Sequence, residues 1–236
     1  MTLLAGFVVA LFSISLPGPL LLIGWLGVGA IAWWTIASLI VSYWVYDRSG
    51  LYEVLWLSQM LGPRKPARWI SVHAGLDEFT SPLRQHLGID PLAVLDISDP
   101  VEMTERSIAR ARAVSPPHPG TIAAKSIHLP LPDGGCDAVF ALFAVHELRS
   151  HEVRTALCRE LHRLLAPGGV IVVAEHLRDL PNLIALGPGF LHFHARARWL
   201  ASFEAARLRI ERESTITPFV RVWLLGDGLS EPARTS

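Results

Sequence analysis

The chain has 236 residues, 51% of them hydrophobic, and its 21 basic and 21 acidic side chains give a net charge of zero. This neutral composition lacks the basic surface of a nucleic-acid-binding protein, so we expect no nucleic-acid partner. The length suits one α/β domain of roughly 190 residues and a smaller appendage.

The N-terminal segment is uncharged, because the first charged residue of the chain is Asp47. A helix needs about 20 apolar residues to cross a bilayer. We therefore predict a transmembrane helical hairpin over residues 1–46, with passes at 2–16 and 20–45 separated by Pro17-Gly18-Pro19. A secretory signal peptide is the alternative, but it would need a basic start and a shorter apolar run.

The region 47–68 is predicted to be a juxtamembrane or lid helix. Ser49 to Leu61 is capped at its start, ends before Gly62-Pro63 and is too apolar for a solvated surface helix. It would lie in the membrane interface or cover a ligand site, and a plain amphipathic linker helix fits equally well. Basic residues next to the apolar segment predict that the domain lies on the cytoplasmic side of the membrane: Arg48, Arg64, Lys65 and Arg68.

Residues 69–227 carry the pattern of one folded domain, followed by a polar, loose tail at 228–236. Its first three strands are predicted at 69–72, 90–97 and 121–127. Between the second and third, Asp99-Pro100-Val101-Glu102 is typical of a helix start and predicts a helix to about Ala113. Cys136 and Cys158 are expected to be unpaired thiols.

The stretch from His128 to His176 organises the domain. Asp133-Gly134-Gly135 predicts a turn, and residues 137–144 are apolar on both faces, as in a strand covered by helices on both sides. Ser150 would cap a helix that runs to Leu165, and Pro167-Gly168-Gly169 would end it before a strand at 170–174. This βαβ unit indicates a parallel sheet whose carboxyl edge carries acid-base residues.

The C-terminal part predicts a short connecting helix after Arg178, a helix at 195–206 and a hairpin of strands at 208–216 and 219–225. Residues 187–194 combine glycine, apolar residues and histidines. They could shape a pocket, touch the membrane or form an ordinary loop.

The run from Leu129 to Glu175, with its Leu-Pro-Leu-Pro-Asp-Gly start, Leu-x-x-Leu-Leu-x-Pro-Gly-Gly helix end and strand ending in Glu, resembles the Rossmann-like class I S-adenosylmethionine-dependent methyltransferases. It is most similar to the ubiquinone and menaquinone biosynthesis branch. The resemblance implies an α/β fold with a seven-stranded, mostly parallel sheet and a reversed last strand. It also implies S-adenosylmethionine as the cofactor.

The same resemblance implies where the cofactor binds. The family's glycine loop follows the first strand, where this chain has His73-Ala74-Gly75-Leu76-Asp77 and keeps one glycine. Asp96 takes the position of the acid that binds the ribose hydroxyls. Lys125 stands where the family often has an adenine-binding Asp, and Tyr46-Asp47 is similar to a pair that folds over the cofactor. The cofactor residues are therefore expected to be His73, Gly75, Asp77, Asp96, Ile97 and Phe143.

The catalytic candidates are His146, Glu147 and His176, at the ends of two strands. An imidazole titrates near neutral pH, so His146 is expected to act as general base or to orient the substrate. A histidine packed under a helix is the alternative. The membrane segment suggests a small or lipid-soluble methyl acceptor, such as a quinone precursor or a lipid headgroup.

Two other functions remain open. The histidines and carboxylates at the strand ends could serve a metal-dependent enzyme, although their spacing matches no recognised ligand motif and we assign no metal ligands. A non-catalytic membrane protein on the same fold is the third interpretation. The oligomeric state is not predicted.

Overall fold

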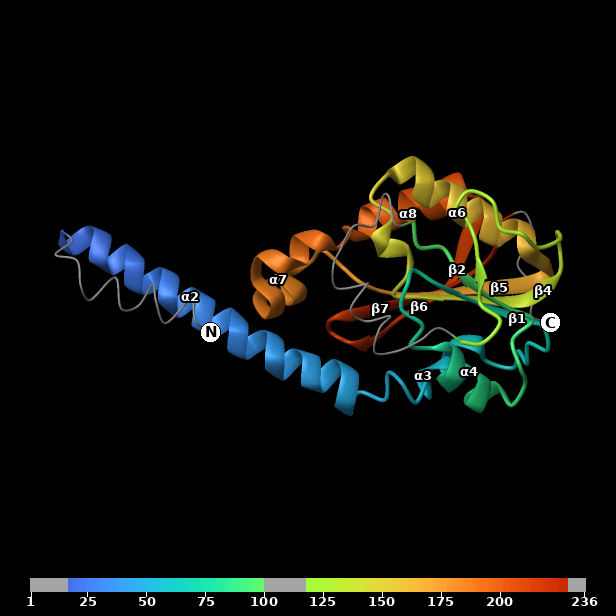
Figure 1. Cartoon of the computed structure of the whole chain (residues 1–236), viewed down its shortest axis with the longest axis horizontal. Coiled ribbons are helices and arrows are strands. Elements are labelled where there is room, and N and C mark those ends of the chain that lie inside the picture. Colours follow the sequence, from blue (N-terminus) through green and yellow to red (C-terminus); the bar gives the residue numbers. More distant parts are fainter. Residues whose placement is uncertain (1–16, 100–117, 229–236) are drawn as a thin grey trace, which may run out of the picture.

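The computed structural model describes residues 17–99 and 118–228, and Figure 1 shows a sheet flanked by helices with one long helix leading away from it. Within these residues seven strands form one sheet in the order β3-β2-β1-β4-β5-β7-β6. The strands are β1 (Trp69–His73), β2 (Ala93–Asp96), β3 (Ile122–Ala123), β4 (Cys136–Leu142), β5 (Leu165–His176), β6 (Leu208–Thr217) and β7 (Val220–Asp227).

Strand directions match the sequence-based prediction. β3, β2, β1, β4 and β5 are mutually parallel, whereas β7 pairs antiparallel with both β5 and β6. The predicted α/β sheet with a reversed last strand is therefore confirmed. The parallel strands all end at one edge, which is where open α/β sheets bind ligands.

Helices cover both faces of the sheet. α6 (His151–Leu164) and α8 (Arg196–Ala205) lie on one face, and α3 (Trp56–Leu61) and α4 (Thr80–Leu87) lie on the other (Figure 1). This two-sided cover explains why β4 is apolar from Ala138 to Leu142, where every residue is buried. Cys136 and Cys158 are buried and unpaired, as expected.

Three predicted elements differ in length. The third strand has only two residues, because Lys125 and His128 pair across a turn and end it. Helix α3 begins at Trp56 and not near Ser49, since Gly50 and Val54 both have positive φ angles that interrupt a helix. The helix predicted over 99–113 lies outside the described residues.

The Pro167-Gly168-Gly169 turn is also placed differently. Helix α6 begins after Ser150, whose hydroxyl accepts a hydrogen bond from Val153, but it ends at Leu164. Leu165 already pairs with Cys136, and the ladder between β4 and β5 shifts register before Ala138. The Pro-Gly-Gly segment is thus an irregular part of β5, and the helix ends at Leu164, three residues before Pro167.

The long helix α2 (Gly18–Ser42) continues as a π-helical turn η1 from Tyr43 to Arg48. The span Gly18–Arg48 has a mean hydropathy of 1.9, and no side chain of α2 is buried against the protein. The second predicted pass is therefore a helix long and apolar enough to cross a membrane. The first predicted pass, 2–16, lies outside the described residues.

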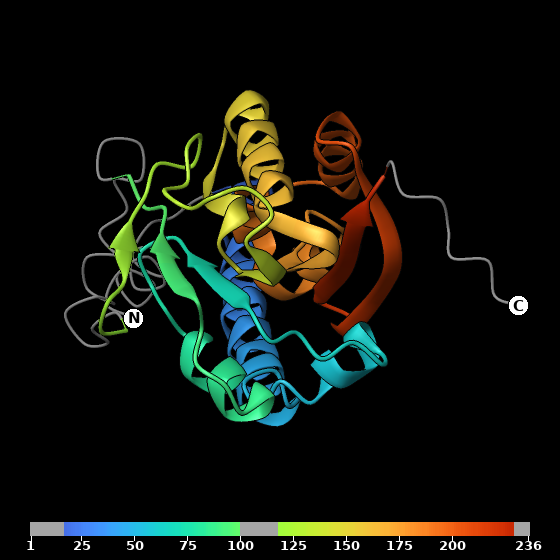
Figure 2. The ribbon, with the colours of Figure 1, turned by 90° about the vertical axis from the view of Figure 1, so that its right-hand side faces the viewer.

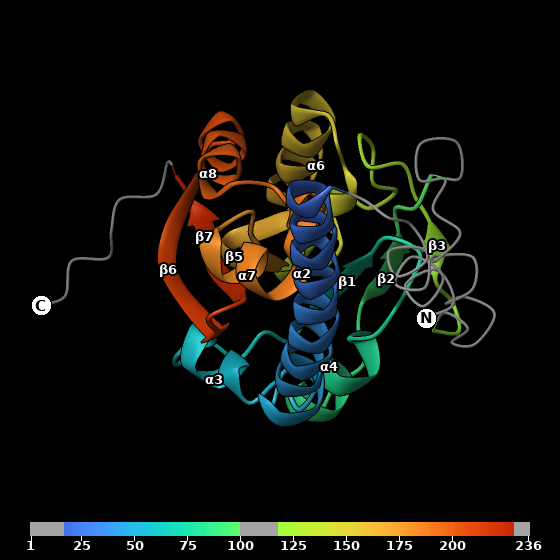
Figure 3. The same ribbon diagram turned by 90° about the vertical axis from the view of Figure 1, so that its left-hand side faces the viewer.

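Helix α7 (Leu180–Leu186) joins α2 to the domain. Asp179 caps α7, and the indole of Trp33 donates a hydrogen bond to the carbonyl oxygen of Ile184. In Figure 3 both helices cross in front of the edge where β1 and β5 end, and in Figure 2, from the other side, α2 lies behind the sheet. The apolar helix is therefore held beside the carboxyl edge of the sheet.

Gly187 is the tightest point of this α2–α7 contact. Its φ is +55°, and a Cβ there would lie 2.5 Å from the Trp34 ring. We expect Gly187→Ala to lower the free energy of unfolding by about 2–4 kcal/mol, from the left-handed backbone and the overlap together. Thermal unfolding followed by tryptophan fluorescence in detergent measures this loss.

Gly88→Ala is the matched control, because Gly88 has φ +73° but open space around its Cβ position. Only the backbone cost of about 1–2 kcal/mol is expected there. Equal losses for the two variants would contradict a close α2–α7 contact.

Candidate active site

A cavity of about 370 Å³ lies at the carboxyl edge of the sheet. Its floor contains Leu142, Phe143, His146 and Glu147 from the end of β4, and His176 from the end of β5. One wall is the end of the long apolar helix, and another is the loop after β1. Further lining residues are Val41, Ser42, Val45, Tyr46, Ala74, Leu76, Glu78, Phe79, Leu186 and Phe193.

Asp96 and Gly75 lie side by side at the ends of β2 and β1. The Oδ1 atom of Asp96 accepts hydrogen bonds from the backbone N–H of Gly75 at 3.0 Å and of Ser98 at 2.9 Å. Gly75 has φ +92°, a conformation that favours glycine. The buried ring of His73 lies 3.8 Å from the same carboxylate oxygen. The carboxylate thus fixes the path of the loop after β1.

A second cavity of about 580 Å³ lies beyond β2, lined by Ile97, Ser98, Lys125 and Leu148 among the described residues. The chain neighbours of Gly75 and Asp96 line the two cavities: Ala74 lines the first and Ile97 lines the second.

Asp77, predicted to bind the cofactor, lies in the loop after β1, and its Oδ1 accepts a hydrogen bond from the N–H of Thr80, the first residue of α4, at 3.0 Å. The neighbouring Glu78 accepts a hydrogen bond from the hydroxyl of Tyr52 at 2.9 Å. Burial and the charge of Glu78 raise the pKa of Tyr52, so this phenol keeps its proton. The polar groups of this loop are therefore bonded to the domain.

His146 lies between two carboxylates. Its Nδ1 donates to Oε2 of Glu175 at 2.7 Å, and its Nε2 lies 3.2 Å from Oε1 of Glu147. Burial alone would lower the pKa of His146, but the charges and hydrogen bonds of Glu175 and Glu147 outweigh it and raise the pKa to about 10. At neutral pH the ring then carries its proton and acts as a hydrogen-bond donor. Of the two predicted roles, this state suits substrate orientation better than general base catalysis.

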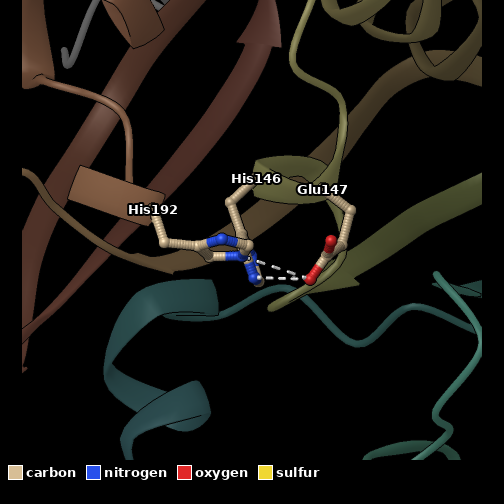
Figure 4. Close-up of side chains that lie close together, drawn as sticks. All are labelled: His146, Glu147 and His192. Carbon is tan, nitrogen blue, oxygen red and sulfur yellow. Dashed lines mark ion pairs between the residues drawn. The ribbon is translucent and has the colours of Figure 1, made fainter. Parts of the chain in front are cut away.

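His192, at the end of the 3-10 helix η3 (Gly187–His192), completes this group. Its Nε2 lies 3.6 Å from Oε1 of Glu147, and Figure 4 shows both histidines directed at the same carboxylate oxygen. The hydrogen bonds from His146 and His192 lower the pKa of Glu147. The sequence pattern does not single out His192, although shaping a pocket is one of the alternatives that it leaves open for residues 187–194.

His176 makes two directional contacts. Its Nδ1 donates to the carbonyl oxygen of Phe219 at 2.9 Å, so a neutral ring accepts at Nε2 the hydrogen bond from the Tyr46 hydroxyl, 3.1 Å away. The ring also stacks on Phe193, with centroids 4.9 Å apart. His176 thereby connects the π-helical turn η1, which follows the long apolar helix, to the end of β5.

Phe143 lines the first cavity between Phe79, which follows β1, and His176, which ends β5. Its backbone has φ +53°, its N–H donates to the carbonyl of Ala174, and its ring stacks on Phe79 with centroids 5.7 Å apart. A non-glycine residue with positive φ is strained and is often found at functional sites. The first cavity therefore has an aromatic floor that the neighbouring elements hold in place.

Comparison with known proteins agrees with this architecture. A family model described as a methyltransferase domain matches residues 73–173, which include the loop after β1, β2 and the β4–α6–β5 unit. No curated protein sequence matches the chain.

Solved structures share the fold at low sequence identity. An S-adenosylmethionine-dependent methyltransferase from Aquifex aeolicus is 16% identical, with a TM-score of 0.56 over 76% of this chain and 93% of that one. The chain has the class I methyltransferase fold. A similar enzyme from Clostridium acetobutylicum is 7% identical, with a TM-score of 0.55 over 80% and 98%. A putative methyltransferase in complex with the Haloferax volcanii activator Trm112 is 16% identical, with a TM-score of 0.55 over 83% and 96%.

The buried ring of His176 predicts a pH-dependent stability of this methyltransferase fold. Burial lowers the pKa of His176, so the folded protein binds fewer protons at this ring than the unfolded chain does. The neutral His176 ring contributes fully to the free energy of unfolding when the pH is above about 6.5, the pKa of histidine in the unfolded chain. As the pH falls below that value, this contribution is lost by up to about 1.4 kcal/mol per pH unit. We expect His176→Gln to reduce the fall of the melting temperature between pH 7.5 and 5. If His176→Gln and the unchanged protein showed the same dependence of melting temperature on pH, His176 would not be the cause of that dependence.

Proposed function

We propose that this chain is a membrane-anchored methyltransferase that uses S-adenosylmethionine and methylates a small amphiphilic acceptor from the bilayer, such as a quinone precursor or a lipid headgroup. One observation carries the proposal: the apolar helix and the carboxyl edge of the methyltransferase sheet line the same cavity.

The residues present fit the cofactor. Asp96 ends β2 at the position suited to two ribose hydroxyls, because one carboxylate can accept both hydrogen bonds. Ile97 offers an apolar contact in the second cavity, and Gly75 lets the backbone pass close to the ligand. When bound, the sulfonium would supply an activated methyl group. With one glycine in this loop, the hydrogen bond that Asp96 accepts from the N–H of Gly75 would hold the backbone in place beside the cofactor.

Methyl transfer depends mainly on alignment of the nucleophile with the methyl group, so the protein must hold the acceptor in one pose. His146 and Glu147 line the first cavity and supply polar contacts at its floor. Phe143, Phe193 and His176 supply aromatic surface around them. This combination suits a flat acceptor with one reactive polar atom.

The membrane side of the cavity suits the tail of an amphiphile. Val41, Ser42 and Val45 line the cavity from the apolar helix, and Leu186 lines it from α7. The outer surfaces of both helices are apolar and exposed: Leu39 is 67% exposed and Leu180 is 66% exposed. A contiguous apolar surface of this kind marks a membrane or protein contact. An acceptor dissolved in the bilayer would reach the cavity between α2 and α7.

The orientation in the membrane follows from charge. Arg48 ends the apolar span, and basic residues that remain on the cytoplasmic side typically flank such a span. We infer that the domain faces the cytoplasm. A non-catalytic scaffold would need no open cavity at the carboxyl edge, so the cavity favours an enzyme.

Binding of the cofactor can be tested at Asp96. We expect Asp96→Ala to weaken S-adenosylmethionine binding at least tenfold, because it removes the ribose acceptor and the charge-assisted hydrogen bonds from the N–H groups of Gly75, in the loop after β1, and Ser98, in the loop after β2. Asp96→Asn keeps an oxygen for the loop and should have an intermediate effect. Isothermal titration calorimetry with the detergent-solubilised protein measures the dissociation constants.

Asp90→Asn is the matched control, since this carboxylate is 74% exposed and pairs with Arg84 away from both cavities. Its dissociation constant should equal that of the unchanged protein. Absence of a binding isotherm for the unchanged protein would refute the proposed cofactor.

The route from the bilayer can be tested at Val41. A Val41→Trp substitution places a large ring at the cavity wall and should lower methylation of membrane lipids at least tenfold, with little change in S-adenosylmethionine affinity. The assay follows transfer of a radiolabelled methyl group into the organic extract of membranes that contain the protein. Leu39→Trp, on the exposed side of the same helix, should retain activity. Equal losses in both variants would contradict entry between α2 and α7.

A further inference from the structure

His146, Glu147 and His192 converge on one point at the rim of the first cavity. The three ligand atoms lie within 4.8 Å of one another, and the two measured separations are 3.2 Å and 3.6 Å. Ligands bonded to one metal ion at about 2.0–2.2 Å are roughly 3.0–3.5 Å apart in tetrahedral or octahedral geometry. We propose that these three side chains form a binding site for a divalent transition-metal ion, with zinc as its representative.

A buried carboxylate prepares His146 for this role. Glu175 is fully buried, and its Oε2 accepts the hydrogen bond from Nδ1 of His146. That bond leaves Nε2 as the ring atom that faces Glu147. Histidine ligands of metal ions usually donate their second ring N–H to a carboxylate in this way, which fixes the tautomer and the ring orientation.

The ligand set selects the class of ion. Two imidazoles and one carboxylate suit zinc and its first-row neighbours, whereas magnesium and calcium prefer oxygen ligands only. Glu175 and Glu147 attract a cation to the space between the rings, and a metal ion would replace the proton they hold on His146. Three protein ligands leave coordination positions open toward the cavity that His146 and Glu147 line.

Arg149 is the competing group. Its guanidinium contacts the ring and the carbonyl oxygen of His192. A hydrogen bond to a ring nitrogen uses the lone pair that a metal ion needs, so the ion must displace Arg149 from the ring. Arg149 is exposed and can keep its bond to the carbonyl oxygen. Removal of this side chain should therefore strengthen metal binding, whereas it would only loosen a plain hydrogen-bonded network.

The experiment titrates the full-length protein in detergent with Zn²⁺ by calorimetry and with Co²⁺ by visible absorption. We expect one equivalent to bind with a dissociation constant in the micromolar range or below, and Co²⁺ to show absorption bands typical of nitrogen and oxygen ligands. His192→Ala and Glu147→Gln should each weaken binding at least tenfold. Arg149→Gln should strengthen it several-fold.

His128→Ala is the matched control, because His128 is exposed and lies outside this group. It should bind the ion as the unchanged protein does, and circular dichroism of each variant verifies that it is folded. Absence of saturable binding would overturn the proposal, as would equal affinity in His192→Ala, Glu147→Gln and the unchanged protein. Because metal binding is measured without cofactor or acceptor, its outcome is independent of the proposed methyl transfer.

Discussion

The buried carboxylate of Glu175 is the interaction on which the candidate site depends. Its Oε1 accepts the backbone N–H groups of Val145 and His146, and its Oε2 accepts the ring N–H of His146. A buried carboxylate without such partners would cost several kcal/mol. The three hydrogen bonds therefore fix the 3-10 turn η2 (Val145–Glu147) against the end of β5, and they determine where His146 and Glu147 point.

The second constraint is the position of the apolar helix. Tyr46 bonds to His176, Val45 is fully buried, and Trp33 bonds to α7, so the helix is fixed to the domain at three points along its length. A flexible tether would only raise the local concentration of membrane lipids around the domain. This fixed helix also forms a wall of the cavity, so in the proposed membrane-anchored enzyme it would determine the direction from which a lipid acceptor enters.

The sheet could be predicted from sequence because its signals are local. The run from Leu129 to Glu175 carries a turn, a doubly buried strand, a capped helix and a second strand in order, and the last two strands carry a clear hairpin pattern. The residues at which helices and strands begin and end were less predictable. Tertiary pairing extends β5 back to Leu165, across a Pro-Gly-Gly motif that by itself indicates a turn.

The site was only partly predictable, because its residues come from distant parts of the chain. Four residues could be predicted because they end or follow parallel strands, and the carboxyl ends of such strands meet at the ligand-binding edge of the sheet: His146, Glu147, Asp96 and His176. His192 was missed because η3 follows no strand, and its approach to Glu147 depends on how α7 docks on the long helix. Asp77 is predicted to bind the cofactor from its position in the loop, and the sequence pattern did not show that its carboxylate also accepts the N–H of Thr80 at the start of α4.

The loop after β1 has one glycine, Gly75, and neighbouring side chains fix its path. Glycines let a backbone approach a ligand, but they leave the loop's conformation to be fixed by other contacts. Here the side chain of Asp96 fixes the loop by accepting the N–H of Gly75, while Asp77 and Thr80 fix its far end. The hydroxyl of Thr80 also donates to the hydroxyl of Ser71, so the start of α4 is bonded to β1 as well as to Asp77. Side-chain hydrogen bonds therefore hold the loop at both ends and fix a conformation that its one glycine alone would leave free.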